Sequence, residues 1–477
     1  MFVFFLIYFF DNQEKSITFV AKYKKEEEMA YYKRKIDDVL LKWKNSNKHK
    51  PLLLRGARQV GKSSSIRHLG EQFEFYIEIN LERQKQIQNL FKSDLDVKRI
   101  VADISSIMQI PVIEGRTLVF FDEIQECEEA ISALRFFWED MPNLHVIAAG
   151  SLLEFALNEI SSFGVGRISS VFMYPMSFDE FILAQGYDGL YQEKKKACAT
   201  EPLSDILHKK LVELFRTFIM VGGMPEAVVT WIDTHEYLQC QDIHNEIVTT
   251  YEDDFGKYRQ KANPMLVRAT LASVAHQTGN KFIFSRVGQE YKSATIKEAL
   301  QWLTLAGLVT PVCSTAGNGL PLGAEANTNI AKYLYLDSGL LLAILNMELG
   351  NIGKLTEQIL LSSAADLVNK GSITEMIAGL EIIKSMPNTH RPSMYYWQRE
   401  AKGSTAEVDY LIAKDMKILP IEVKAGTQGG MKSLHYYMEQ KNIEKAVRTS
   451  LENFGQIEHE KYVIEICPLY AISSLFG

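Results

Sequence analysis

The chain has 477 residues, more than one hydrophobic core normally accommodates, so we expect two to four domains. Hydrophobic residues make up 47% and charged residues 23% of it, which is typical of soluble globular proteins. The formal net charge of -7 excludes binding of nucleic acid through overall charge, although a local basic groove would be compatible with it.

The cysteines are scattered, and none forms a C-x-x-C pair or accompanies a histidine cluster. We therefore expect neither a disulfide framework nor a structural zinc ion, which fits a reducing cytoplasm. Each cysteine is predicted to fill space in the core. They are Cys127, Cys198, Cys240, Cys313 and Cys467.

The N-terminal segment Met1–Phe10 is fully apolar, but Asp11 ends it at about half the ~20 residues that a membrane-spanning helix needs. It has neither the basic start nor the small-residue cleavage site of a secretory signal, so we expect no stable membrane span. A mixed-charge run precedes Met29, and a helix is predicted over residues 31–43. We interpret residues 1–28 as a translated upstream leader; the alternative is a short anchor on a membrane surface.

The strongest motif follows the short apolar strand Leu52–Leu54. It is a G-x-x-x-x-G-K-S loop that leads into a helix, and strand, loop and helix in this order are typical of a P-loop. The glycines let the backbone N–H groups curl towards phosphate oxygens, Lys62 reaches the β- and γ-phosphates, and the Ser63 hydroxyl binds Mg²⁺. The alternative is a chance match at a strand–helix turn. The predicted ATP-binding residues are Gly56, Ala57, Arg58, Gln59, Val60, Gly61, Lys62, Ser63 and Ser64.

A second apolar strand, residues 117–123, ends in two carboxylates. In P-loop ATPases such an aspartate holds Mg²⁺ and the following glutamate activates the attacking water. Asp122 is therefore the predicted metal residue and Glu123 the predicted general base. The alternative is a polar strand end that caps the next helix.

Three more strands are predicted at residues 73–81, 145–149 and 170–174, separated by helical patterns. Such alternation indicates an α/β domain, a parallel sheet with helices on both faces. Ser151, where the 145–149 strand ends, is either a sensor beside the γ-phosphate or an N-cap. Arg167 is either an arginine finger towards a neighbour's nucleotide, which would require a homo-oligomer, or a surface arginine.

Five stretches occur in an order that resembles the AAA-like bacterial and archaeal ATP-binding proteins with a C-terminal domain of unknown function. The resemblance runs from about Met29 to the C-terminus, and it implies a P-loop fold in which an extra strand separates the two Walker strands. On this basis we expect an ATPase domain at 29–200, a helical lid and winged-helix domain at 201–330, and a C-terminal domain at 331–477. The five stretches are GARQVGKS, FFDEIQ, AAGSLLEF, VGRI and YPMSFDEF.

The middle of the chain begins with a predicted helix over residues 209–221, followed by Gly-Gly-Met-Pro-Glu at 222–226. This G-x-P turn resembles the element by which related signalling ATPases sense nucleotide from their helical lid. Equally, glycine could stop one helix and proline start the next.

Residues 264–310 read as three short helices, Met265–Thr278, Phe284–Tyr291 and Thr295–Ala306, followed by a strand at 308–312. This order predicts a helix-turn-helix with a wing. If it binds DNA, the helix at 293–301 would lie in the major groove with Lys292 and Lys297 near phosphate. The same helix carries a glutamate and is not strongly basic, so the alternative is a packing platform.

The last third of the chain contains a D…E-x-K pattern, with Asp409 on one predicted strand and Glu422 and Lys424 on the next. Residues two apart on a strand project to the same side, so two carboxylates could hold Mg²⁺ while Lys424 positions or activates a water. Glu375, on a helix predicted at 374–384, could add a carboxylate, and Gln398 could flank the site. The pattern is that of a restriction-endonuclease-like α/β fold, to which the family resemblance also points. The competing interpretation is a domain that kept these residues but binds rather than cuts.

The sequence therefore predicts a cytoplasmic ATPase, with ATP and Mg²⁺, whose nucleotide cycle controls a nuclease-like domain that acts on DNA or RNA. The alternative is an ATP-dependent regulatory switch that binds a protein partner and has no nuclease activity.

Overall fold

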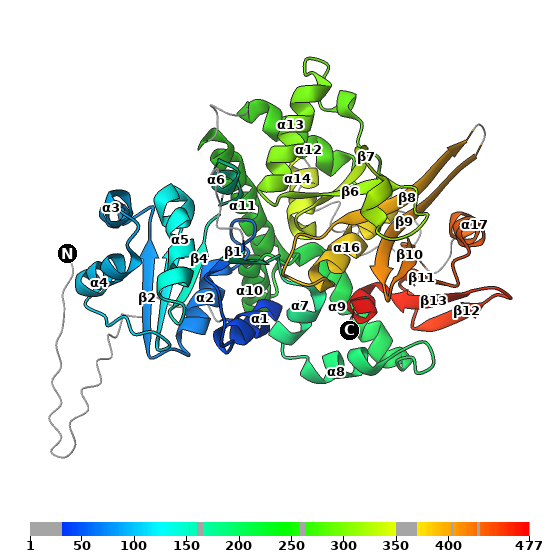
Figure 1. The fold of residues 1–477 in the computed structure, drawn as a ribbon. Coiled ribbons are helices and arrows are strands. Elements are labelled where there is room, and N and C mark those ends of the chain that lie inside the picture. The colour runs from blue at the N-terminus through cyan, green and yellow to red at the C-terminus, as the bar shows by residue number, and fades with distance from the viewer. Residues whose placement is uncertain are drawn as a thin grey trace. The chain divides into compact units, whose positions relative to one another are not determined.

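The computed structural model describes residues 31–151, 153–159, 166–257, 263–349, 370–401, 404–426 and 430–476. The apolar segment Met1–Phe10, the expected leader at 1–28 and the first part of the VGRI stretch lie outside the described residues. The elements named below belong to one unit, Tyr32–Gly477 (Figure 1). Within the described ranges, no helix combines the length and the apolar character needed to cross a bilayer.

The first part of the chain forms a five-stranded parallel sheet in the order β2-β3-β4-β1-β5. Strand β4 lies between β1 and β3, so an extra strand separates the two Walker strands, as the resemblance implied. The elements are α1 (Lys35–Lys44), β1 (Leu52–Arg55), α2 (Lys62–Gly70), β2 (Phe75–Asn80), α3 (Lys85–Ser93), α4 (Val97–Met108), β3 (Thr117–Asp122), α5 (Glu128–Asp140), β4 (His145–Ala149), α6 (Leu153–Glu159) and β5 (Ser169–Phe172).

Both faces of this sheet are buried because each strand is apolar on both sides. In β1, Leu52 and Leu54 pack into one hydrophobic core, while Leu53 packs into a second one with α3, α4 and α5. Strand β3 is likewise buried along its whole length. A parallel sheet covered on both faces presents the carboxyl ends of its strands as the open edge, where a nucleotide site is expected.

A helical segment follows the sheet. It contains α7 (Phe178–Ala184), α8 (Asp188–Lys196), α9 (Asp205–Val221), α10 (Pro225–Thr234), α11 (Tyr237–Lys257), α12 (Pro264–His276), α13 (Ser293–Leu305) and α14 (Ser338–Leu349). Between α9 and α10, Gly222 stops one helix at φ +69° and Pro225 starts the next.

One predicted helix is wrong, and so is one predicted burial. Residues Phe284–Tyr291 form only a 3-10 turn at Phe284–Arg286, and none of these three described residues is buried. Phe284, Val287 and Tyr291 are partly buried against the core, but Gly288 follows directly and disfavours a helix, so the turn does not continue. Cys198 is exposed rather than in the core, and Cys313 is only partly buried, whereas Cys127, Cys240 and Cys467 are buried.

The second sheet has eight strands in the order β12-β13-β11-β10-β9-β8-β6-β7. Its strands are β6 (Val309–Thr315), β7 (Ala326–Tyr335), β8 (Met394–Ala401), β9 (Ser404–Lys414), β10 (Lys417–Val423), β11 (Lys445–Ser450), β12 (Gly455–Glu458) and β13 (Val463–Pro468), accompanied by α16 (Lys370–Ser385) and α17 (Lys432–Lys441). Because β6 pairs in parallel with β8, the β6–β7 hairpin extends the C-terminal sheet. The expected boundary between residues 330 and 331 falls inside β7.

Candidate nucleotide site and acidic site

The loop between β1 and α2 has the backbone of a phosphate-binding loop. Gly56 and Gly61 adopt φ values of +150° and +98°, which favour glycine, and Gln59 between them has φ +64°. A Cβ at Gly56 would lie 2.2 Å from the carbonyl oxygen of Met173. The loop can therefore pass this close to its neighbour only with glycine at position 56.

The Lys62 side chain is folded back into this loop. Its Nζ donates to the carbonyl oxygens of Gly56 and Ala57 at 2.9 and 2.8 Å, and the side chain is buried. Burial lowers the pKa of Lys62 to about 8, although Glu123 and Asp122 oppose this shift. The ammonium group therefore lies inside the loop that phosphates would fill.

Ser63 and Asp122 bring two oxygen ligands together. The Ser63 hydroxyl donates to Asp122 Oδ1 at 3.2 Å, and Asn80 Nδ2 donates to Asp122 Oδ2 at 3.4 Å. Burial raises the pKa of Asp122, and the nearby carboxylates of Glu123 and Glu78 add to the effect. A bound cation stabilises the ionised form of a carboxylate whose pKa is raised in this way. The oxygens of Ser63 and Asp122 therefore fit Mg²⁺.

Glu123 is held by hydrogen bonds directly after β3. Its Oε2 accepts from Gln125 Nε2 at 2.6 Å, from Ser151 Oγ at 3.1 Å and from the Ser151 backbone N–H at 3.2 Å. Burial raises the pKa of Glu123, but these hydrogen bonds outweigh it and the pKa is lowered overall. Glu123 is therefore ionised, as a general base must be, and Ser151 connects the end of β4 to it.

Arg58 ties the loop to helix α11. Its NH1 donates to both carboxylate oxygens of Asp254 at 3.0 and 2.9 Å, and the Tyr251 hydroxyl donates to the Arg58 carbonyl oxygen at 2.8 Å. The cleft beside this ion pair encloses about 520 Å³, part of it open to solvent, and Ser151 is among its lining residues. Phe155 of α6 and Trp302 of α13 also line the cleft, and their rings stack with centroids 4.7 Å apart.

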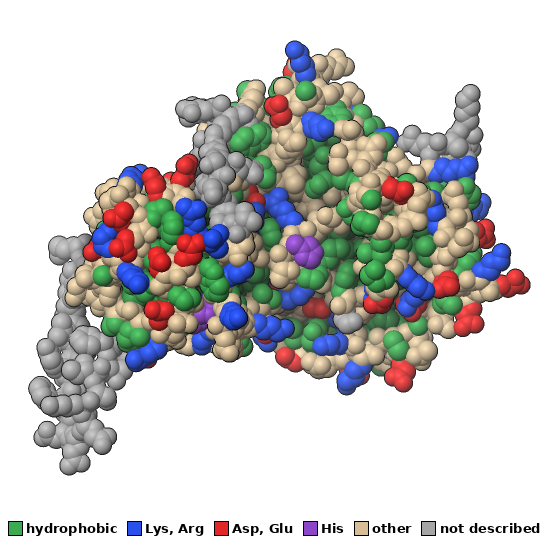
Figure 2. Space-filling model, viewed as in Figure 1, with side chains coloured by type: hydrophobic (Ala, Val, Ile, Leu, Met, Phe, Trp, Pro, Cys, Tyr) green, Lys and Arg blue, Asp and Glu red, His purple; other side chains and the backbone are tan. Residues whose placement is uncertain are grey.

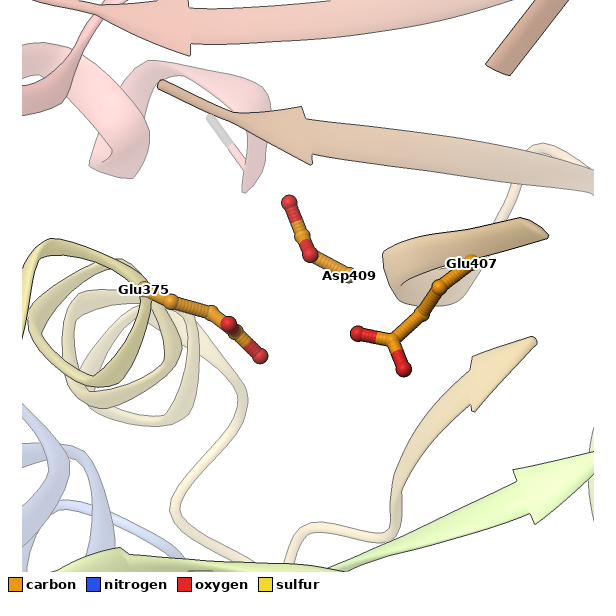
Figure 3. A group of neighbouring side chains, drawn as sticks. All are labelled: Glu375, Glu407 and Asp409. Carbon is orange, nitrogen blue, oxygen red and sulfur yellow. The ribbon is translucent and has the colours of Figure 1, made fainter. Parts of the chain in front are cut away.

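A second site lies in the C-terminal sheet, where Glu375 of α16 meets Glu407 and Asp409 of β9 (Figure 3). One carboxylate oxygen from each of these residues lies within 4.8 Å of the other two. We call this group, with Glu422, Lys424 and the neighbouring Lys332, the acidic site. Tyr410 pairs with Ile421 across β9 and β10, so Asp409 lies opposite Glu422.

Hydrogen bonds account for only part of the acidic site. Asp409 Oδ2 accepts from the Val423 backbone N–H at 2.7 Å, and Lys424 Nζ donates to Glu422 Oε1 at 2.5 Å. Burial, with Asp409 adding to it, raises the pKa of Glu375 to about 8 and that of Glu422 to about 7. Glu422 Oε2 is buried and has no hydrogen-bond partner among the described residues. The unsatisfied oxygen and the crowded carboxylates fit a site that a cation completes.

Three comparisons place the chain among known proteins. Residues 48–182 match the family model described as an AAA domain. Residues 212–350 and 370–471 match models described as domains of unknown function (DUF8612 and DUF4143). No curated protein matches the chain. Together with the P-loop and the strand order, the match to the AAA-domain model identifies the kind of domain that contains the five-stranded sheet.

Residues 48–182 form a P-loop AAA domain.

Two solved structures are similar to the chain. A Walker-type ATPase of Pyrococcus abyssi is 17% identical, with a TM-score of 0.43, over 66% of this chain and 96% of that one. The Orc1 protein of Aeropyrum pernix, solved in complex with DNA, is 12% identical, with a TM-score of 0.28, over 67% and 92%.

The AAA domain brings most of its predicted site residues together. Lys62, Ser63, Asp122, Glu123 and Ser151 converge at the carboxyl ends of β1, β3 and β4. Ser64 is on α2 and exposed. Arg167 is elsewhere on the surface, where it forms an ion pair with Glu139 of α5. Its role as an arginine finger stays a prediction.

Two residues of the acidic site were missed from the sequence. Glu407 is two residues before Asp409 on the same strand. Because side chains alternate between the two faces of a strand, the sequence places Glu407 on the same face as Asp409. Lys332 of β7 is the other: its Nζ lies 2.7 Å from Glu375 Oε1 and also pairs with Glu407. Gln398 lies opposite Glu407 on β8, where the sequence suggested a flanking role.

Proposed function

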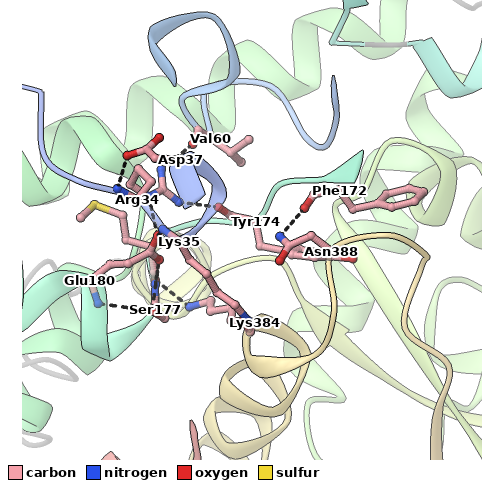
Figure 4. Close-up of polar contacts among 11 residues, drawn as sticks. Arg34, Lys35, Asp37, Val60, Phe172, Tyr174, Ser177, Glu180, Lys384 and Asn388 are labelled. Carbon is pink, nitrogen blue, oxygen red and sulfur yellow. Dashed lines mark hydrogen bonds and ion pairs between the residues drawn. The ribbon is translucent and has the colours of Figure 1, made fainter. Parts of the chain in front are cut away.

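We propose that the chain is an ATP-hydrolysing protein whose nucleotide cycle controls a nuclease-like, nucleic-acid-interacting C-terminal domain. The observation that carries the control is a series of polar contacts in which Arg34 binds the phosphate-binding loop and Lys35 binds α16, the helix that bears Glu375 (Figure 4).

Hydrolysis uses the residues gathered around the loop. Lys62 would hold the β- and γ-phosphates, and Ser63 and Asp122 would hold Mg²⁺, which would neutralise charge on the phosphate oxygens. Glu123 orients a water and accepts its proton as the water oxygen bonds to the γ-phosphorus and the bond to the β-phosphate oxygen breaks. Ser151 keeps the Glu123 carboxylate in place, as the 3.1 Å hydrogen bond between them supports.

The acidic site supplies the nuclease-like chemistry. Asp409, Glu422 and Glu375 would hold a divalent ion, which polarises a phosphate oxygen of the nucleic acid. Lys424 would position the attacking water. The buried, unpartnered Oε2 of Glu422 supports this assignment, because it is an acceptor that only a cation or a donor from outside the described residues would satisfy.

The contacts that connect the two sites start from neighbouring residues. Arg34 donates from NH1 to the carbonyl oxygen of Val60 in the phosphate-binding loop at 3.0 Å, and Arg34 Nε donates to Glu180 at 2.9 Å. The next residue, Lys35, donates from Nζ to carbonyl oxygens at the end of α16, including that of Lys384 at 3.0 Å. A shift of the phosphate-binding loop on nucleotide binding would therefore pass from Arg34 to Lys35, its neighbour in the chain, and from Lys35 to α16.

Further bonds fix α16 and the residues after it to the AAA domain. Lys384 Nζ donates to the carbonyl oxygen of Met176 at 3.0 Å, and the Phe178 backbone N–H donates to Glu381 at 3.0 Å. Asn388 exchanges two 2.7 Å hydrogen bonds with the backbone of Phe172 (Figure 4). These contacts are buried or half-buried, where hydrogen bonds are electrostatically stronger than in water.

The test is a cleavage assay on the full chain. Linear, supercoiled and single-stranded DNA and RNA are incubated with Mg²⁺ or Mn²⁺, with and without ATP, beside Asp409→Ala and Lys62→Ala. We expect cutting that depends on Asp409 and changes with ATP in the wild type but not in Lys62→Ala. Absence of cutting under every condition would contradict the nuclease role, and wild-type ATP turnover by Lys62→Ala would contradict the ATPase role.

Two observations favour the second candidate, an ATP-dependent switch that binds a protein partner. Lys332 already neutralises part of the acidic site. On the face drawn in Figure 2, basic side chains are mixed with acidic ones. A pull-down with and without ATP, beside a salt-dependent DNA-binding titration, discriminates the two candidates.

The α12–α13 pair followed by β6 and β7 has the element order of a winged helix, and its DNA-binding role remains open to the same titration. Lys292 and Lys297 are exposed, as phosphate contacts require. However, Trp302 on α13 stacks on α6 of the AAA domain. That contact favours the packing-platform interpretation.

A further inference from the structure

Lys332 is a buried lysine in the middle of the acidic site. It comes from β7, and only 2% of its surface is exposed. Its Nζ lies 2.7 Å from Glu375 Oε1, pairs with Glu407, and stands 5.1 Å from the centre of the Tyr396 ring. A lysine buried this deeply keeps its charge only when carboxylates surround it.

The charges around Lys332 keep it protonated. Burial lowers the pKa of Lys332, but Glu375, Glu407 and Asp409 outweigh burial, and the pKa is raised overall. The ammonium group forms ion pairs with two of the three carboxylates that converge in Figure 3, Glu375 and Glu407.

A divalent ion and this ammonium group compete for the same carboxylates. Mg²⁺ or Mn²⁺ binds carboxylate oxygens at about 2.1 Å, and the Oε1 atoms of Glu375 and Glu407 are already hydrogen-bonded to Lys332. Two cations held by one group of oxygens would also repel each other strongly at this depth. Lys332 leaves available the Oε2 atoms of Glu375 and Glu407, the oxygens of Asp409 and the unpartnered Oε2 of Glu422. An ion that used Glu375 or Glu407 would lie beside the ammonium group.

We propose that Lys332 is a built-in counter-cation that competes with divalent ions for the acidic site, so that an ion binds tightly only when the ammonium group is displaced. This inference rests on the proposed function, which makes the acidic site a metal site.

Strand β7 gives Lys332 a connection to the nucleotide side of the molecule. Just past the end of the strand, Asp337 Oδ2 accepts from the Gly223 backbone N–H at 2.7 Å. Gly223 leads into Pro225, and a Cβ placed on Gly61 of the phosphate-binding loop would lie 3.5 Å from the Pro225 ring. A displacement of this turn would pull on the strand that carries Lys332.

The test measures Mn²⁺ binding by calorimetry on the full chain without nucleotide. Asp409→Asn defines the heat that belongs to the acidic site. Lys332→Met removes the charge, Lys332→Gln removes it while keeping hydrogen bonds to Glu375 and Glu407, and Lys332→Arg retains it. Lys417→Met is the matched control, because Lys417 is in the same sheet but pairs with Glu444 on the surface.

We expect Lys332→Met and Lys332→Gln to bind Mn²⁺ at least about tenfold more tightly than the wild type, in an Asp409-dependent manner. Lys332→Arg and Lys417→Met should bind like the wild type. The Mn²⁺-induced rise in melting temperature should follow the same order, and it shows whether each variant is folded.

The possible failures are distinguishable. Asp409-dependent binding of equal strength in the wild type and both neutral variants would overturn the competition while leaving the metal site intact. Weaker binding in both neutral variants would make Lys332 a supporting residue and would also overturn the competition. If neither the wild type nor any variant shows Asp409-dependent binding, the metal site itself is wrong, and the inference falls with it.

Discussion

The ammonium group of Lys35 lies 3.0 Å from the backbone carbonyl oxygen of Lys384, in the last turn of α16. It also reaches the carbonyl oxygens of Ser385 and Met386, at 3.1 and 3.2 Å. The C-terminus of a helix carries a partial negative charge and unsatisfied carbonyl groups, so a lysine there acts as a cap. This cap comes from the start of α1, beside the residue that holds the phosphate-binding loop.

Lys35→Met should loosen α16 and disconnect it from the nucleotide. We expect a loss of about 1 kcal/mol in the free energy of unfolding, since a charged cap is removed. Hydrogen exchange of the α16 amides should become faster, and it should no longer respond to a non-hydrolysable ATP analogue. Lys33→Met is the control, because Lys33 forms an exposed ion pair with Asp38. An unchanged response of α16 in Lys35→Met would contradict the connection.

Glu123→Gln should bind ATP and fail to hydrolyse it, because the amide cannot accept the proton of the attacking water. We expect kcat to fall about 10²- to 10⁴-fold with little change in nucleotide affinity. Ser151→Ala should lower kcat about tenfold, because it removes one of the hydrogen bonds that hold the Glu123 carboxylate. Steady-state kinetics and urea unfolding measure both effects. If Ser151→Ala lowers stability but leaves kcat unchanged, Ser151 is an N-cap rather than a sensor.

Nucleotide affinity should weaken as pH rises through about 8. Burial lowers the pKa of Lys62 to about 8 in the free protein, and phosphates bind the protonated form. Above this pH, binding has to be accompanied by proton uptake, which costs affinity. Fluorescence titrations with an ATP analogue between about pH 7 and about 9.5 would show the decline. Lys62→Met should bind weakly at every pH without that decline; the same slope in Lys62→Met would assign the titration to another group.

The free energy of unfolding should decrease as the pH rises from about 4.5 to about 8, because of the acidic site. Burial raises the pKa of Glu375 to about 8 and that of Glu422 to about 7, from 4.5. The folded state therefore binds more protons than the unfolded state in this window, and the free energy of unfolding decreases with rising pH. Urea denaturation at several pH values, without divalent ions, measures the slope. Glu375→Gln should flatten it, and a slope of unchanged size in this variant would contradict the assignment.

The sequence predicted the AAA domain well because its signals are local. The strand, the glycine loop and the helix follow one another from Leu52 to Gly70, and Asp122 and Glu123 directly follow an apolar strand. The family resemblance supplied the position of β4, which no local pattern contains. The helix at Phe284–Tyr291 was wrong because the segment forms only a 3-10 turn before Gly288, which disfavours a helix.

The acidic site was predicted only in part, because some of its residues lie far apart in the sequence. Asp409, Glu422 and Lys424 lie on neighbouring strands, and strand alternation places them together. Lys332 is 43 residues before Glu375 and 75 before Glu407. The position of Lys332 depends on the pairing of β6 with β8, and the residue pattern of a single strand does not predict that pairing.

That same pairing makes the C-terminal part a poor candidate for expression alone. A fragment that begins at residue 370 would keep β8 but lose β6 and β7, and it would leave a row of backbone N–H and C=O groups on β8 open to other molecules. Such a fragment would be prone to aggregate edge to edge. It would also leave Glu375 and Glu407 without their lysine, so any metal affinity measured on it would describe a different site from that of the whole protein.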